Sequence, residues 1–281
     1  MSNEEFRLLR DFIHGYCGIY FEETSRFLLE NRLARRLKQH GLGRFTEYYH
    51  FLKYDKQREE ELAAVVDILT TNETYFFREE YQLKALTEEI LPEIRERNRA
   101  KRTLSIWSAG CSTGEEPYTI AMLLLEQGIW SDWKVDIFGS DISQRVLASA
   151  RKGVYRGNAF RATPEALKGR YFTPEGDGFR IADRVRNWVS FASINLFDSG
   201  KAALVGTMDI ILCRNVIIYF DQTKKKSVIG MFLGKLADGG FLLLGHSESL
   251  INLSTAFTLR HFRHDMVYQK PMPAGAARSE T

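Results

Sequence analysis

The fold is decided by the stretch Leu104-Ser-Ile-Trp-Ser-Ala-Gly-Cys-Ser-Thr-Gly-Glu-Glu-Pro-Tyr118, in which an apolar strand runs into a turn of small residues and then into a helix. Gly110 and Gly114 allow the backbone to turn sharply and to approach a ligand closely, and a proline suits the first turn of the helix. Further on, Lys134 to Asp141 form a second expected strand that ends in a carboxylate, where doubly wound folds hold a ribose diol. The pair predicts a cofactor site at the ends of two parallel strands.

The glycine pattern argues against bound phosphates. The glycines are four apart and not arranged as Gly-x-Gly-x-x-Gly, and no Lys-Ser/Thr pair follows as in a P-loop. S-adenosylmethionine has a ribose, an adenine and an amino-acid end but no phosphate, so it fits this loop better. On the loop alone, an ordinary strand, turn and helix of an α/β protein is the alternative interpretation.

Length and composition are those of a soluble globular chain, with 281 residues, 44% hydrophobic and 27% charged. No apolar run approaches the roughly 18 residues that span a bilayer, and no export signal precedes the first helix. Cys17, Cys111 and Cys213 follow neither a zinc nor a disulfide pattern. We therefore expect a cytoplasmic protein without direct membrane insertion and without a metal site.

The charge is nearly balanced overall but uneven along the chain. A net charge of +3 argues against a general nucleic-acid binder, whereas residues 24–58 carry nine Lys and Arg against three Asp and Glu. Such a basic segment indicates an acidic or polar partner.

Apolar periodicity divides the chain into parts. Residues 1–75 show only helical spacing and predict an all-α domain, and 76–102 predict a linker helix. From 103 to 270 strands and helices alternate, which predicts a doubly wound α/β sheet. A Gly-Asp-Gly turn predicts a small antiparallel β insert at about 171–189, and the tail 271–281 has the composition of a disordered segment.

The expected sheet has seven strands. The last two form an antiparallel hairpin with a two-residue turn at the sheet edge. The strands are expected near residues 103–108, 134–140, 188–193, 208–213, 240–245, 257–262 and 265–270.

Four further polar segments follow strands or join the two domains: Thr70-Thr-Asn-Glu-Thr-Tyr-Phe-Phe-Arg78, Ser193-Ile-Asn-Leu-Phe197, Cys213-Arg-Asn-Val-Ile-Ile-Tyr-Phe220 and Gly245-His-Ser-Glu-Ser249. Together with the glycine loop, and in the same order, they resemble the chemoreceptor glutamate methyltransferases of bacterial chemotaxis, the CheR family. The resemblance extends from the first helices to about Lys270. It implies a class I S-adenosylmethionine-dependent methyltransferase that esterifies receptor glutamates and releases S-adenosylhomocysteine.

The resemblance also implies site residues. Arg78 and Tyr219 are expected nearest the transferable methyl group, as the catalytic pair. Without the family pattern, Tyr219 would be a half-buried aromatic, and His246 stays open between the acceptor channel and an ordinary loop. The cofactor pocket is expected to be lined by Asn72, Thr74, Arg78, Gly110, Glu116, Asp141, Asn195, Leu196, Cys213, Arg214 and Asn215.

The chemistry of this reaction needs no catalytic base. A glutamate side chain is already ionised near neutral pH, and its charge and that of the sulfonium cancel in the transition state. The protein therefore contributes mainly orientation and exclusion of water. Because a tight grip would stabilise the charged ground state, Arg78 is expected to orient the acceptor and Tyr219 to add one hydrogen bond.

Arg32, Arg35 and Arg36 are spaced i, i+3 and i+4 and form a basic stripe on one expected helix. Alone, this is a solvated helix face. The resemblance implies contact with the glutamate-rich methylation helices of a receptor, and recruitment to receptor arrays at the inner membrane. It also allows a receptor C-terminal tail peptide on the β insert, and nothing indicates an obligate dimer, so we expect a monomer.

Two other functions share this fold. A nucleic-acid methyltransferase is disfavoured because the chain has no Asn/Asp-Pro-Pro-Tyr/Phe motif. The second is a regulator that binds S-adenosylmethionine without transferring its methyl group.

Overall fold

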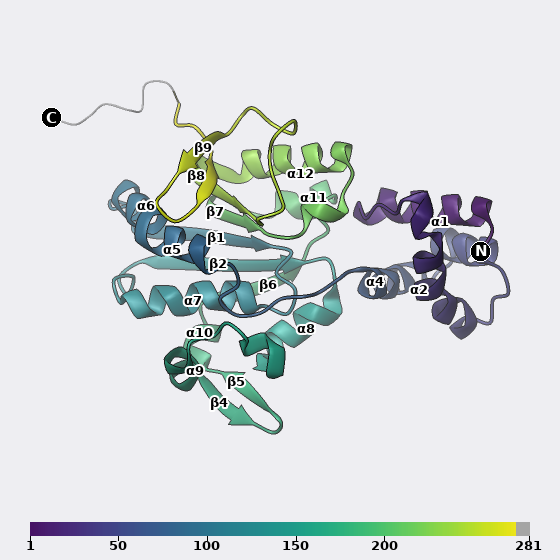
Figure 1. Cartoon of the computed structure of the whole chain (residues 1–281), viewed down its shortest axis with the longest axis horizontal. Helices are drawn as coiled ribbons and strands as arrows, with labels where there is room; N and C mark the ends of the chain where they lie inside the picture. Colours follow the sequence, from purple (N-terminus) through teal and green to yellow (C-terminus); the bar gives the residue numbers. More distant parts are fainter. Residues whose placement is uncertain (274–281) are drawn as a thin grey trace.

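The computed structural model describes residues 1–273 and shows a helical domain beside a larger α/β domain (Figure 1). The tail predicted at 271–281 lies, from residue 274 on, outside the described residues. Among residues 1–273, no helix has the length and apolarity that a membrane crossing needs.

The helical domain packs the apolar stripes seen in the sequence around one core. Leu9, Leu29, Leu33 and Leu52 are fully buried there, on three different helices. Ser2 begins the first helix with a capping box, which satisfies its free N–H groups. The helices are α1 (Asn3–Cys17), α2 (Arg26–Gln39), α3 (Phe45–Tyr54) and α4 (Arg58–Leu69), with a 3-10 turn η1 (Glu23–Ser25) before α2.

A buried carboxylate ties three of these helices together. Glu61 on α4 is 2% exposed and accepts hydrogen bonds from Arg36 and His40 at the end of α2 and from Tyr48 on α3. Burial opposes ionisation, but these donors together hold the pKa of Glu61 below its usual value. The domain thus has a polar anchor as well as an apolar core.

The expected linker helix is interrupted. It consists of α5 (Glu80–Ala85), a π-helical turn η2 (Leu86–Ile90) and α6 (Leu91–Arg97) in direct succession. Pro92 lies in the first turn of α6 and has no N–H to donate, so one backbone hydrogen bond of the helix is missing. The wider π-helical turn η2 before it accommodates this gap.

The α/β domain contains the predicted seven-stranded sheet, in the order β6-β2-β1-β7-β8-β10-β9. Its strands are parallel except for β10, which runs antiparallel to both neighbours. This confirms the class I methyltransferase sheet. The strands are β1 (Thr103–Ala109), β2 (Lys134–Asp141), β6 (Val189–Ser193), β7 (Met208–Cys213), β8 (Leu236–Leu244), β9 (Thr258–His261) and β10 (Met266–Gln269).

Two strand predictions need correction. β8 begins at Leu236, earlier than expected, because an irregular register beside β7 and a left-handed Gly239 hide its start in a polar stretch. The hairpin between β9 and β10 turns through residues 262–265 and not through two residues. Both differences arise where backbone irregularity replaces apolar alternation.

Helices cover both faces of the sheet (Figure 1). Ile210 and Leu212 of β7 pack toward α5, α6 and α7 (Glu115–Gln127), whereas Ile211 and Cys213 pack toward α12 (Gln222–Lys235). This alternation decides which strand residues can reach the site. The remaining helical elements of the domain are α8 (Gln144–Lys152), α11 (Ser199–Ala203) and the 3-10 turn η4 (Ile217–Tyr219).

The antiparallel insert starts earlier than predicted. Its three-stranded sheet, in the order β3-β5-β4, begins at residue 154 and ends at 181, whereas the sequence suggested 171–189. The first strand is only two residues long and gives no periodic signal. The elements of this region are β3 (Val154–Tyr155), η3 (Gly157–Phe160), α9 (Glu165–Tyr171), β4 (Phe172–Glu175), β5 (Gly178–Ile181) and, after the insert, α10 (Asp183–Arg186).

Candidate active site

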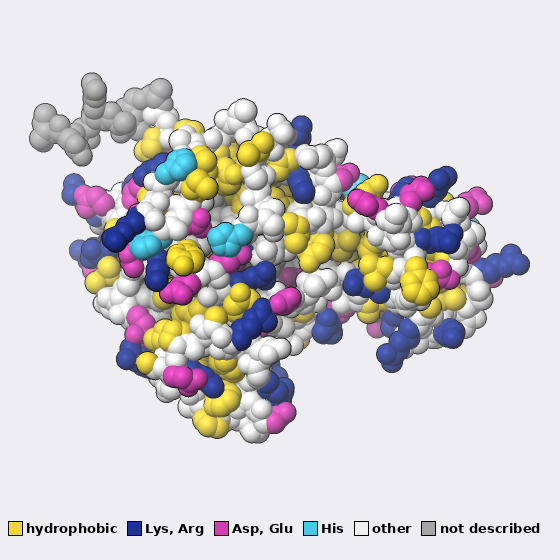
Figure 2. All heavy atoms as spheres, viewed as in Figure 1, with side chains coloured by type: hydrophobic (Ala, Val, Ile, Leu, Met, Phe, Trp, Pro, Cys, Tyr) yellow, Lys and Arg dark blue, Asp and Glu magenta, His cyan; other side chains and the backbone are white. Residues whose placement is uncertain are grey.

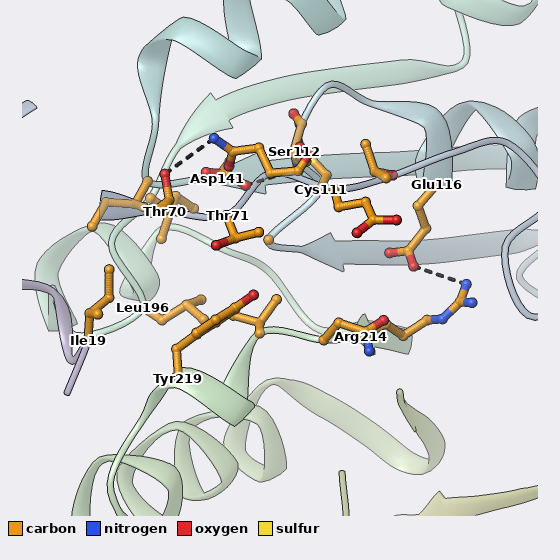
Figure 3. Close-up of a pocket in the computed structure, with 18 of the residues that line it drawn as sticks. Ile19, Thr70, Thr71, Cys111, Ser112, Glu116, Asp141, Leu196, Arg214 and Tyr219 are labelled. Atoms are coloured by element: carbon orange, nitrogen blue, oxygen red, sulfur yellow. Dashed lines mark hydrogen bonds and ion pairs between the residues drawn. The ribbon is translucent and has the colours of Figure 1, made fainter. Parts of the chain in front are cut away.

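A large pocket lies where the carboxyl ends of β1, β2, β6 and β7 meet the helical domain (Figure 3). Its empty space is about 1160 Å³ when the open mouth is counted, and side chains of both domains line it. Because the ends of parallel strands share one edge of a sheet, the loops that follow these four strands converge here, where the interdomain segment 70–78 joins them.

The loop after β1 forms one wall. Gly110 has φ +81° and donates its N–H to Ser140 O (2.7 Å), and a Cβ at this position would overlap Val216. Ser112 donates its N–H to Asp141 Oδ2 (2.9 Å) and its hydroxyl to Asn72 O (3.2 Å). The glycine loop is therefore joined to β2 and to the interdomain segment, which fixes the pocket's shape.

Asp141 presents a fixed carboxylate to the pocket. It accepts the N–H of Ser143 at Oδ1 (2.9 Å) as well as that of Ser112 at Oδ2. Burial raises the pKa of Asp141, and these N–H donors limit the rise. Since each carboxylate oxygen has a second lone pair, the group can still accept hydrogen bonds from a diol.

Arg214 is held between two acidic residues. Its Nη1 donates to Glu116 Oε2 (3.2 Å), drawn in Figure 3, and its Nε to Glu79 Oε2 (3.2 Å). Its Nη2 donates to Arg78 O (2.6 Å), and Ser108 donates to the other Glu116 oxygen (2.6 Å). With 4% of its side chain exposed, Arg214 positions these neighbours and is not a freely available cation.

Arg78 and Tyr219, the expected catalytic pair, both line the pocket. Arg78 donates from Nη1 to Glu73 O (3.1 Å), which leaves further guanidinium donors for an acceptor carboxylate. Tyr219 is 39% exposed, and Figure 3 shows its ring reaching into the pocket from the side opposite Asp141. The arrangement can orient a substrate, and neither side chain is hydrogen-bonded to a general base among residues 1–273.

Asn195 and Leu196 also line the pocket, in different ways. The Asn195 amide donates to Tyr16 O of α1 (2.6 Å) and accepts the N–H of Phe197 (3.1 Å), so it connects the two domains. Leu196 and Ile19 supply apolar surface suited to a flat ring (Figure 3). Thr74 lines the interdomain wall together with Asn72.

Cys213 does not reach the pocket, contrary to expectation. It is the last residue of β7 and is fully buried on the α12 face of the sheet, as strand alternation requires. Burial also raises the pKa of its thiol well above the usual value. The turn that lines the pocket begins one residue later, at Arg214.

Asn215 and Glu248 shape that turn. Glu248 accepts N–H bonds from Gly245 (2.8 Å), Asn215 (2.7 Å) and Val216 (2.9 Å), which holds Asn215 at a left-handed φ of +59°. Asn215 lines the pocket, and among the described residues its buried Oδ1 has no hydrogen-bond partner.

Several pocket residues escaped the sequence prediction. Cys17 and Ile19 come from the end of α1, and no local signal shows that this helix reaches the pocket. Glu248 supports the pocket turn without lining the pocket; it lies in a quoted motif, and its place in a turn after a buried strand was the available signal. His246 is exposed on the same turn, and its role stays open. No group of three or more potential metal ligands occurs among residues 1–273.

The three arginines of the predicted basic stripe on α2 have different roles in the structure. Arg36 is ion-paired with the buried Glu61, and Arg32 donates to Leu69 O (2.7 Å), so both serve the helical domain itself. Arg35 is exposed. In the view of Figure 2, Lys and Arg side chains of this domain are spread among acidic ones and not gathered in one patch.

Each of the two domains matches a family model. Residues 72–266 match the model described as "CheR methyltransferase, SAM binding domain", and residues 4–70 match "CheR methyltransferase, all-alpha domain". The chain belongs to the CheR methyltransferase family. It is thus an S-adenosylmethionine-dependent methyltransferase by family, and the predicted cofactor is confirmed.

Curated relatives cover nearly the whole chain. Identity is 36% to chemotaxis protein methyltransferase 2 of Vibrio cholerae serotype O1, over 96% of this chain and 94% of that protein. It is 37% to the chemotaxis protein methyltransferase of Escherichia coli K12, over 92% and 89% respectively. The enzyme of that name from Borreliella burgdorferi is 37% identical over 89% of each chain.

Solved structures show a weaker likeness. Magnesium protoporphyrin IX methyltransferase from Synechocystis PCC 6803 with bound SAM aligns over 95% of this chain and 96% of that one, at 13% identity and a TM-score of 0.37. TehB from Haemophilus influenzae aligns over 64% and 62%, at 10% identity and a TM-score of 0.36. At these scores we draw no argument from either.

The residues of the CheR pocket suit S-adenosylmethionine. Asp141 offers fixed acceptors for a ribose diol, and Leu196 offers an apolar wall. Glu116 adds negative charge. The pocket thus offers hydrogen-bond acceptors for the hydroxyl groups of S-adenosylmethionine and acidic groups for its positive charge.

Proposed function

We propose that this chain methylates glutamate side chains of chemoreceptors, as a protein-glutamate O-methyltransferase in the sensory adaptation of chemotaxis. Support comes from relatives that are named chemotaxis protein methyltransferases. This chain matches them over nearly their full lengths. The observation that carries the proposal is an arginine, Arg78, at a pocket of this family, with guanidinium donors left for a carboxylate.

The cofactor supplies a methyl group on a sulfonium. The acceptor carboxylate forms an O–CH₃ bond as the C–S bond breaks, the electron pair stays with sulfur, and no proton moves. Arg78 orients the carboxylate through its forked donors, and Tyr219 adds a hydrogen bond at the opposite wall. The helical domain closes one side of the pocket through Cys17 and Ile19 and so excludes water.

The proposed partner is a glutamate-rich cytoplasmic receptor helix. Arg35 is the exposed member of the basic stripe and is the residue of the three that we propose for this contact. Complementary charge would raise the encounter rate more than the affinity. The enzyme is proposed to act as a cytoplasmic monomer recruited to receptor arrays, and a receptor tail peptide on the insert remains a prediction.

Labelled S-adenosylmethionine, receptor-bearing membranes and the purified chain test the proposal. We expect base-labile label on receptor glutamates, lost with Arg78→Ala while S-adenosylhomocysteine binding persists. Label in added nucleic acid, or cofactor binding without transfer to receptor, would refute it in favour of the other two functions. Near-parental turnover by Arg78→Ala would refute the role of that residue alone.

A further inference from the structure

One side chain of the β insert reaches the loop that carries Arg78. Arg161, just after η3, is ion-paired with Glu73 (Nη2–Oε1, 2.7 Å), and its guanidinium lies 3.7 Å from the centroid of the Tyr75 ring. A guanidinium this close to a ring stacks on its face. Arg161 therefore holds two residues of the interdomain loop at once.

Arg78 makes contacts with the same two residues. Its Nη1 donates to Glu73 O (3.1 Å), and its guanidinium lies 5.6 Å from the Tyr75 ring centroid. The insert and the proposed catalytic arginine are thus connected through one three-residue stretch of the loop, residues 73–75. A change in Tyr75 or Glu73 transfers directly to Arg78.

The loop needs such support because its backbone is strained. Phe77 and Glu79, on either side of Arg78, have left-handed φ values of +61° and +60°. Non-glycine residues in this region are strained and persist only where the surroundings hold them. Phe77 is held by its N–H bond to Thr119 Oγ1 (3.1 Å), and Glu79 by Arg214.

The backbone of the loop is anchored on the insert at Phe76. Phe76 donates its N–H to Ala159 O (2.9 Å) and packs against Phe160 and Phe172. These contacts fix the backbone at Phe76 but not the side chains of Glu73 and Tyr75. Arg161 is the insert residue that fixes those.

We infer that Arg161 is a positioning residue for methyl transfer, which acts by holding Tyr75 and Glu73 and through them the guanidinium of Arg78. The inference rests on the proposed function. Arg161 touches neither acceptor nor cofactor in this role. Its ion pair with Glu73 is exposed and contributes little stability by itself, so its effect falls on geometry, where a displacement of about 1 Å can cost about a hundredfold in rate.

The planar guanidinium is essential to this role. Arg161→Lys keeps a charge near Glu73 but loses the planar stack on Tyr75, because an ammonium is a compact point charge. Arg161→Ala loses both contacts. We therefore expect the lysine variant to lie between the parent and the alanine variant in turnover.

The test measures methyl transfer to a receptor cytoplasmic fragment that lacks its C-terminal tail. Arg161→Ala should lower kcat about tenfold or more, with the KM for S-adenosylmethionine and the S-adenosylhomocysteine Kd within about threefold of the parent. Arg156→Ala is the matched control, since it removes another exposed arginine and its ion pair with Asp177 from the same insert. It should keep parental kcat.

Tyr75→Leu adds a second measurement. If Arg161 acts through Tyr75, the double variant Arg161→Ala/Tyr75→Leu should lose less than the product of the two single losses. Full additivity would overturn the inference. So would an unchanged kcat in Arg161→Ala, or a loss confined to the KM of the acceptor, which would make Arg161 a docking contact. If the parent chain itself transfers no methyl group to the fragment, the proposed function fails.

Discussion

Arg214, which lines the pocket, forms a buried ion pair with Glu79, with Nη2 3.1 Å from Oε2 and less than a tenth of either side chain exposed. The same guanidinium contacts Glu116 and the carbonyl of Arg78. One cation therefore balances two carboxylates from the linker and from α7. This makes Arg214 the residue that sets the spacing between the glycine loop and the loop of Arg78.

Arg214→Ala should be strongly destabilising, because it leaves Glu79 and Glu116 without their cation. Removal of one partner from a buried pair costs about 3–5 kcal/mol. Urea unfolding measures this loss, and calorimetry should show weaker S-adenosylhomocysteine binding. Adding Glu79→Gln should restore part of the stability, and a double variant less stable than the single would contradict this explanation.

Glu115 should make stability depend on pH near neutrality. It is 3% exposed, and burial raises its pKa from 4.5 to about 7. Between these values the folded chain binds a proton that the unfolded chain releases, so stability falls as pH rises through this window, by up to about 3 kcal/mol. Thermal unfolding should show Glu115→Gln more stable than the parent at pH 8 and nearly equal at pH 5. Equal differences at both values would show that Glu115 does not titrate there.

Asp141→Ala should weaken S-adenosylhomocysteine binding by about 1.5–3 kcal/mol, roughly ten- to a hundredfold. The variant loses the acceptor for a ribose diol and frees the N–H groups of Ser112 and Ser143. Calorimetric titration measures the change. Asp136→Ala, exposed on the same strand, is the control; if both variants bind like the parent, the ribose contact is misplaced.

The fold was predictable where apolar patterns are regular. β1 and β7 are largely buried on both faces and rich in apolar residues, and Gly110 and Gly114 mark the loop between β1 and α7. Prediction failed at β3, which has two residues, and at the start of β8, where irregular pairing interrupts the pattern. Short or irregular strands are specified by their neighbours in the fold and not by their own sequence.

The motifs predicted which segments form the site but not which residues their side chains bind. The pairing of Arg36 with Glu61 joins residues 25 positions apart, and that of Asn195 with Tyr16 joins residues 179 apart. Cys213 was placed in the pocket because its neighbours belong there, although strand alternation turns it away. Motifs therefore identified the segments, and only tertiary packing decided which side chains are free.

Receptor contact through α2 is best tested at Arg35. Arg35→Glu should weaken binding to a receptor fragment most at low salt, where charge attraction is least screened, and leave S-adenosylhomocysteine binding unchanged. Lys101→Glu, an equal charge change at an exposed site between α6 and β1, is the control. Arg36→Glu is unsuitable, because it would place a second carboxylate against the buried Glu61. An equal effect of Arg35→Glu and Lys101→Glu would contradict the contact.

Closure of the helical domain over the pocket is tested at Gly18. It ends α1 at φ +76°, and a Cβ there would overlap the Phe197 ring of the α/β domain. Gly41 ends α2 with a similar φ of +67°, yet a Cβ there would meet no atom within 4 Å among the described residues. Alanine at either site should therefore carry a similar backbone cost, about 1–2 kcal/mol.

Only Gly18→Ala should also separate the domains. We expect it to weaken S-adenosylhomocysteine binding at least tenfold beyond Gly41→Ala, as about 1.4 kcal/mol of lost closure requires, because Cys17 and Ile19 leave the pocket wall with α1. Calorimetry measures the binding, and limited proteolysis of the interdomain segment should accelerate in the same variant. If both variants bind alike, the helical domain does not complete the cofactor pocket, and the wall that α1 contributes is dispensable for binding.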